Sequence, residues 1–112
     1  MIEIKNLNKY YNSGSQKFHA LKDINLTFPE KGFYFITGKS GSGKSTLLNI
    51  IGGIDSYDSG DLIINNLNTN NFKRSDYNAY RNSYIGFIFQ EFNVIKNLSV
   101  FDNIALSLRL KN

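Results

Sequence analysis

A short glycine- and serine-rich segment holds the residues of this sequence whose types and spacing could do chemistry. It reads Gly-Lys-Ser-Gly-Ser-Gly-Lys-Ser from residue 38 to residue 45. Its glycines allow the backbone to wrap closely, so that successive N–H groups point at a single anion. Lys44 adds a positive charge on a flexible stem, and Ser45 adds a hydroxyl oxygen of the kind that Mg²⁺ prefers. The segment therefore suits a phosphate group accompanied by magnesium.

The elements expected on either side support this interpretation. Residues 33–37 (Phe-Tyr-Phe-Ile-Thr) are continuously apolar or aromatic, which predicts a strand buried on both faces. After the loop, Leu47, Leu48, Ile50 and Ile51 have the spacing of a buried helix, which Gly52-Gly53 would end. Strand, glycine-rich loop and helix in this order are the context of the Walker A pattern, Gly-x-x-x-x-Gly-Lys-Ser.

The pattern assigns a role to each part of the loop. The helix N-terminus and the wrapped N–H groups would face the phosphates, Lys44 would reach the β- and γ-phosphates, and Ser45 would bind Mg²⁺. A flexible Gly/Ser linker that happens to contain a lysine is the alternative, but it does not explain the flanking strand and helix. We expect the nucleotide to contact Gly38, Lys39, Ser40, Gly41, Ser42, Gly43, Lys44, Ser45 and Thr46.

The remaining pattern predicts an α/β domain that opens with an antiparallel sheet. Near-alternation in residues 2–7 and a second apolar stretch in 20–28 indicate two strands, with turn residues between them at 12–16 and Pro29 after them. The expected later elements are strands at 61–65 and 84–89, a short helix within 72–82, and a helix after Ser99, which would be its N-cap.

Length and composition limit the possible classes of protein. The 112 residues suffice for one small domain, which we place at 1–112. The net charge of +4 comes from scattered basic residues, and no basic stripe of the kind that binds nucleic acid is present. The sequence has no cysteine for disulfides or thiolate metal sites, and no apolar run reaches the length of a membrane span.

The stretch from Gly38 to Asp55, followed by Ser59-Gly60, resembles the nucleotide-binding domain of ABC transporters. Within this family, the sequence is similar to the ATPases that partner permeases exporting lipoproteins, macrolides or antimicrobial peptides. The resemblance implies a P-loop NTPase core with an N-terminal antiparallel β subdomain, truncated before the signature and Walker B segments, so that residues 1–112 would be the N-terminal part of one ATP-binding domain. The supporting segments are Tyr10-Tyr11 with 20–26 (Ala-Leu-Lys-Asp-Ile-Asn-Leu), 84–93 (Tyr-Ile-Gly-Phe-Ile-Phe-Gln-Glu-Phe-Asn), and 98–104 (Leu-Ser-Val-Phe-Asp-Asn-Ile).

The resemblance implies further site residues and partners. An aromatic residue before the second strand would stack on adenine; Tyr11 is favoured by its spacing and Tyr10 is the alternative. Gln90 would be the Q-loop residue that touches Mg²⁺ and acts with Lys44 in catalysis. The implied ligands are ATP and Mg²⁺. The implied partners are a transmembrane permease subunit or domain and a second ATP-binding domain in a head-to-tail dimer, at the cytoplasmic face of the cell membrane.

Some family motifs do not occur in these 112 residues: the LSGGQ signature, a Walker B strand with its acidic residues, and the switch histidine. His19 lies in the wrong region to serve as the switch and is expected at the surface. Hydrolysis needs an oriented water as well as bound phosphates and metal, so we expect these residues alone to be inactive as an ATPase. A hydrolysis-deficient nucleotide-binding remnant and another P-loop NTPase or kinase are the alternative functions.

Overall fold

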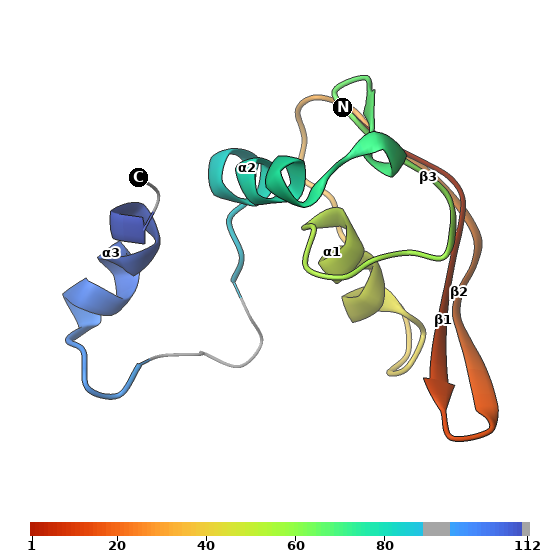
Figure 1. The fold of residues 1–112 in the computed structure, drawn as a ribbon, viewed down its shortest axis with the longest axis horizontal. Helices are drawn as coiled ribbons and strands as arrows, with labels where there is room; N and C mark the ends of the chain where they lie inside the picture. Colours follow the sequence, from red (N-terminus) through yellow and green to blue (C-terminus); the bar gives the residue numbers. More distant parts are fainter. Residues whose placement is uncertain (89–94, 111–112) are drawn as a thin grey trace.

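The computed structural model describes residues 1–88 and 95–110 (Figure 1). The strands are β1 (Ile2–Ser13), β2 (Gln16–Phe28), β3 (Ser59–Ile64) and β4 (Leu67–Asn68), and a 3₁₀ turn covers Thr69–Asn71. The helices are α1 (Lys44–Ile51), α2 (Arg74–Tyr84) and α3 (Val100–Leu110). None of the described helices is long and apolar enough to cross a membrane.

One antiparallel sheet organises the first half of the chain, as the sequence predicted. Its strand order is β2-β1-β3-β4. The β1–β2 hairpin turns at Gly14-Ser15, where Gly14 has a positive φ of 61°, and Tyr11 lies directly opposite Phe18. β1 also pairs with β3, so that Ile4 lies opposite Leu62. The second strand begins at Gln16, earlier than expected, because the two-residue turn brings the flanking residues into register at once.

A small apolar core lies between this sheet and the first two helices. Leu47 and Ile50 from α1 and Tyr80 from α2 are buried in one cluster with sheet residues. The Tyr80 hydroxyl donates a hydrogen bond to the Ile51 carbonyl, 2.6 Å away, which ties α2 to the end of α1. Burial raises the pKa of Tyr80 to about 12, so this hydroxyl remains a donor. The sheet residues of the cluster are Ile4, Leu7, Leu21, Leu62 and Ile64.

The helix boundaries follow the expected capping residues. Gly53, just past α1, has a φ of 75°, and its N–H donates to the Ile50 carbonyl at 3.1 Å. Ser99 is the N-cap of α3, because its Oγ accepts a hydrogen bond of 3.0 Å from the Asp102 N–H. The helix expected within residues 72–82 is α2, which begins at Arg74 and extends to Tyr84.

The two apolar strands expected at 33–37 and 84–89 are absent from the described residues. Phe33 and Phe35 are 83% and 80% exposed, and their rings contact each other edge to face, with centroids 4.9 Å apart. Tyr84 ends α2, residues 85–88 are irregular, and residue 89 lies outside the described part. A strand exists only with a hydrogen-bonded neighbour, and none of the described strands pairs with residues 33–37.

The start of β3 depends on a glycine. Gly60 has a φ of 97°, and a Cβ at this position would lie 2.3 Å from the Asn6 carbonyl oxygen of β1. We expect Gly60→Ala to lower the free energy of unfolding by about 3 kcal/mol, from backbone strain and from the clash together. Gly14→Ala is the control, since its φ is also positive (61°) but no atom lies within 4 Å, and about 1 kcal/mol is expected. Urea unfolding measures both losses, and equal losses would contradict the close approach.

Candidate functional site

The glycine-rich loop is held against the hairpin at the start of α1. α1 begins at Lys44, and Gly43 before it has a φ of 96°. A Cβ on Gly43 would lie 2.8 Å from the Ala20 carbonyl oxygen and 2.9 Å from Leu21 Cδ2, so only glycine fits between the loop and β2. Within the loop, the Ser42 N–H donates to the Lys39 carbonyl at 3.1 Å. The predicted strand before the loop is absent, but the loop and the helix lie as the motif requires.

The side chain of Lys44 folds back over the loop. Its Nζ donates to the carbonyl oxygen of Gly38 and, at 3.2 Å, to that of Lys39. The first turn of α1 contains no acidic residue that would offset the positive end of the helix dipole. Two sources of positive potential, the Lys44 ammonium and the N-terminal end of α1, therefore meet at one place.

This place is hollow. A cavity of about 420 Å³ opens beside the first turn of α1. A neighbouring cavity of about 330 Å³ includes Gly38 and Ser42 in its lining, together with Gly43 and Lys44. Lys39 is exposed on the same loop. The first cavity is lined by Ser40, Gly41, Gly43, Lys44, Ser45 and Thr46 of the predicted set, and by Phe18 and Ala20.

Phe18 and Ala20 were not predicted. They come from β2, and the Phe18 ring is 58% exposed although it is large and apolar. The signal that reveals Phe18 is the hairpin turn at Gly14-Ser15, because a two-residue turn places Tyr11 and Phe18 opposite each other on one face. The wall of the cavity thus includes an aromatic ring from the strand next to β1.

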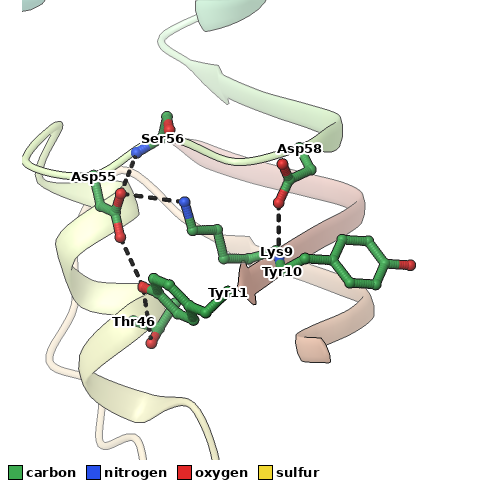
Figure 2. A network of polar contacts seen from close by, with 7 residues as sticks. All are labelled: Lys9, Tyr10, Tyr11, Thr46, Asp55, Ser56 and Asp58. Atoms are coloured by element: carbon green, nitrogen blue, oxygen red, sulfur yellow. Dashed lines mark hydrogen bonds and ion pairs between the residues drawn. The ribbon is translucent and has the colours of Figure 1, made fainter. Parts of the chain in front are cut away.

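Tyr11, and not Tyr10, reaches the loop (Figure 2). The Tyr11 hydroxyl donates to Asp55 Oδ2 at 2.7 Å and lies 3.5 Å from Thr46 Oγ1, in the first turn of α1. Tyr10 points the other way and stacks on His19, with ring centroids 4.1 Å apart. His19 is partly buried by this contact and not fully at the surface. The structure thus places the hydroxyl of the favoured tyrosine next to Thr46, which is one of the residues that line the cavity.

Asp55 connects Tyr11 to a buried lysine. Lys9 is only 7% exposed, and its Nζ lies 3.2 Å from Asp55 Oδ1 and 5.0 Å from the centroid of the Tyr11 ring. The Ser56 N–H also donates to Oδ1, at 2.8 Å. Burial by itself would raise the pKa of the Asp55 carboxyl. The hydrogen bonds from Tyr11, Ser56 and Lys9 and the charge of Lys9 outweigh burial and hold that pKa below its ordinary value.

Of the two expected Mg²⁺ ligands, Ser45 lies in the described part of the chain, whereas Gln90 lies outside the described residues. Ser45 is exposed in the wall of the larger cavity, and no carboxylate is among the residues that line it. The described residues contain no group of three or more His, Cys, Asp or Glu side chains that could hold a metal. A single hydroxyl fits Mg²⁺, which usually takes few protein ligands and completes its shell with phosphate oxygens and water.

The Lys9–Asp55 pair gives a test of stability. Asp55→Ala leaves the Lys9 ammonium buried without its partner, and we expect a loss of about 3 kcal/mol in the free energy of unfolding at neutral pH. Adding Lys9→Met should recover most of this loss, because an apolar chain of similar length needs no counter-charge. Urea unfolding of Asp55→Ala, Lys9→Met and the double variant measures these losses. A loss in the double variant equal to the sum of the two single losses would contradict the ion pair.

The same comparison has a defined pH dependence. The pKa of Asp55 is lowered in the folded state, so its contribution is present above the ordinary value of 3.8 and is lost as the pH falls through the folded value. The advantage of the native protein over Asp55→Ala should therefore shrink below pH 3.8.

Comparisons with known proteins agree with this geometry. The chain is 44% identical over 111 residues to the ABC transporter ATP-binding protein YxdL of Bacillus subtilis, covering 99% of this chain and 43% of that protein. It is 43% identical over 106 residues to the macrolide export ATP-binding/permease protein MacB of Neisseria gonorrhoeae, covering 95% of this chain and 16% of MacB. The chain therefore spans less than half the length of these relatives.

The structure also superposes on a solved one. The dimeric structure of MJ0796, a bacterial ABC transporter cassette, matches with a TM-score of 0.92 and 43% identity, over 100% of this chain and 48% of that one. The protein MJ0796 is from Methanocaldococcus jannaschii. A second structure of MJ0796, a post-hydrolysis state bound to ADP and Pi, has the same TM-score at 42% identity. The family model described as ABC transporter matches residues 21–112, and the chain therefore belongs to the ABC transporter family of ATP-binding proteins.

Proposed function

We propose that this chain binds ATP with Mg²⁺ on the loop from Gly38 to Thr46, and that the complete protein hydrolyses ATP to drive a membrane transporter. The observation that carries the proposal is the cavity of about 420 Å³ at the start of α1. Its lining includes Lys44 and the N-terminus of α1, which together form a positive subsite for an anion.

The triphosphate would lie along this loop. Lys44 now donates to two loop carbonyls, and it can exchange these neutral acceptors for charged phosphate oxygens, which form stronger hydrogen bonds. Ser45 would hold Mg²⁺ between itself and the phosphates, and Thr46 would border the α-phosphate. Gln90 would be a further Mg²⁺ ligand and a catalytic residue. The structure of MJ0796 bound to ADP and Pi supports hydrolysis in this family.

The nucleoside would lie toward the hairpin. The Tyr11 hydroxyl lies next to Thr46, which lines the cavity, and Phe18 offers an aromatic surface in the cavity wall itself. Stacking does not depend on which hydrogen-bonding groups the base carries, because every base has a π-face. The hairpin thus supplies apolar contact, while the loop supplies charge.

The partners proposed for the complete protein follow from its relatives. MacB is an ATP-binding/permease protein, and MJ0796 has been solved as a dimer. We propose a transmembrane permease subunit or domain and a second ATP-binding domain arranged head to tail, with the protein at the cytoplasmic face of the cell membrane. No nucleic acid is part of this function. The single domain at 1–112 is the N-terminal part of the ATP-binding domain in this proposal.

The first test is binding of MgATP by the complete protein, measured by titration calorimetry. Lys44→Ala should lower the affinity at least about tenfold, because a charge-assisted contact to phosphate is lost. Lys31→Ala is the matched control, since this lysine is exposed and lies outside the loop, and it should bind as the native protein does. Equal affinity for Lys44→Ala and Lys31→Ala would contradict the proposed phosphate site.

The second test concerns the base. Tyr11→Ala should lower the affinity for ATP about tenfold through loss of stacking, whereas Tyr11→Phe keeps the ring and should lose much less. The measurement is the same titration. Equal losses in both variants would count against a stacking role for the ring.

A further inference from the structure

We propose that Asp55 is a positioning residue for the nucleotide: it holds the Tyr11 hydroxyl beside the first turn of α1, so that the ring is kept in one orientation for stacking. This inference rests on the proposed function, because it concerns how the adenine platform is kept in place. Asp55 lies after α1, outside the Walker A pattern, and 44 residues from Tyr11 in sequence.

The two oxygens of Asp55 have separate tasks (Figure 2). Oδ1 accepts from the Lys9 ammonium at 3.2 Å and from the Ser56 N–H at 2.8 Å. Oδ2 accepts from the Tyr11 hydroxyl at 2.7 Å. The carboxylate cannot rotate to another orientation without breaking one of these contacts. It is therefore a fixed anchor, and it presents Oδ2 to Tyr11 in a single direction.

Tyr11 needs such an anchor. Its side chain is 38% exposed and lies three residues before the hairpin turn at Gly14, where packing on the strand is sparse. A ring that is free to change rotamer must be ordered when a base stacks on it, and this ordering weakens binding. A hydroxyl fixed at the far end of the ring removes this cost before the ligand arrives.

The anchor also relates the ring to the phosphate loop. The Tyr11 hydroxyl lies 3.5 Å from Thr46 Oγ1, and Asp55 follows the same helix, α1, whose first residue is Lys44. The position of the ring is consequently fixed relative to α1, the helix proposed to bind the phosphates, and not only relative to its own strand. Because the hydroxyl is already bonded, the ring contributes its face to the nucleotide, while the phosphates are held elsewhere.

The experiment separates positioning of the base from support of the loop. The complete protein is titrated with MgATP and with magnesium tripolyphosphate, which carries the phosphates without a nucleoside. Asp55→Ala should lower the affinity for ATP about fivefold and leave the affinity for tripolyphosphate unchanged. Tyr11→Phe should show the same selective loss, about threefold. The double variant Asp55→Ala/Tyr11→Phe should be no weaker than Asp55→Ala, because both changes remove the same hydrogen bond between the Tyr11 hydroxyl and Asp55.

Controls decide between this role and a structural one. Asp58→Ala is the matched control. Asp58 lies on the same loop as Asp55, and its carboxylate accepts a hydrogen bond from the Tyr10 N–H at 2.7 Å. Figure 2 draws no contact between Asp58 and Tyr11. It should leave the ratio of ATP to tripolyphosphate affinity unchanged. If Asp55→Ala does not fold, Asp55→Ala combined with Lys9→Met replaces it, because that pair leaves no buried ammonium unpaired.

Four outcomes would each overturn a stated claim. Equal losses for both ligands in Asp55→Ala, or losses that add fully in the double variant with Tyr11→Phe, would overturn the positioning role while leaving ATP binding intact. A loss of selectivity in Asp58→Ala as large as in Asp55→Ala would do the same. If the native protein binds tripolyphosphate and ATP equally well, the nucleoside makes no contribution, and the base site of the proposed function fails with it.

Discussion

The candidate site depends on how β1 is joined to the segment that follows α1. Lys9 on β1 is buried, and an ammonium removed from water needs a counter-charge close by. Asp55 supplies it, so the segment that follows α1 is bonded to the first strand of the sheet. The other close approach, that of Gly43 to the Ala20 carbonyl of β2, joins the beginning of the same helix to the hairpin. α1 is thus fixed at both ends to one sheet. The loop before it is held in place as well, because it continues directly into α1.

Much of this arrangement could be predicted from residue types alone. The loop and α1 follow from the Gly-x-x-x-x-Gly-Lys-Ser spacing, and the hairpin follows from turn residues between two apolar stretches. The family resemblance, carried by residues 38–55, is confirmed by the match over residues 21–112. Tyr11 and not Tyr10 lies toward α1, because adjacent residues of a strand face opposite sides, whereas stacking of Tyr11 on adenine stays a prediction.

What could not be predicted depends on tertiary contacts. The apolar run at 33–37 predicted a buried strand, but Phe33 and Phe35 are exposed and no described strand pairs with them, because periodicity does not show whether a pairing strand lies next to a segment. Asp55 lies in a stretch where a carboxylate is an ordinary loop residue. Its role depends on Lys9 and Tyr11, which are brought close only when β1 and β3 pair. Phe18 was predictable in principle from the hairpin register, since it requires only the position of the turn.

The topology of the sheet has a consequence for the order in which the site can assemble during synthesis. β1 pairs first with β2, its immediate neighbour in sequence, and such a local hairpin closes quickly. The pairing of Ile4 with Leu62 instead encloses the whole excursion that contains the phosphate loop and α1. Until a nascent chain has emerged through β3, the β1–β3 ladder that closes this excursion cannot form. Closing this long excursion therefore costs more chain entropy than closing the hairpin, and it is a later step in completing the sheet behind the loop.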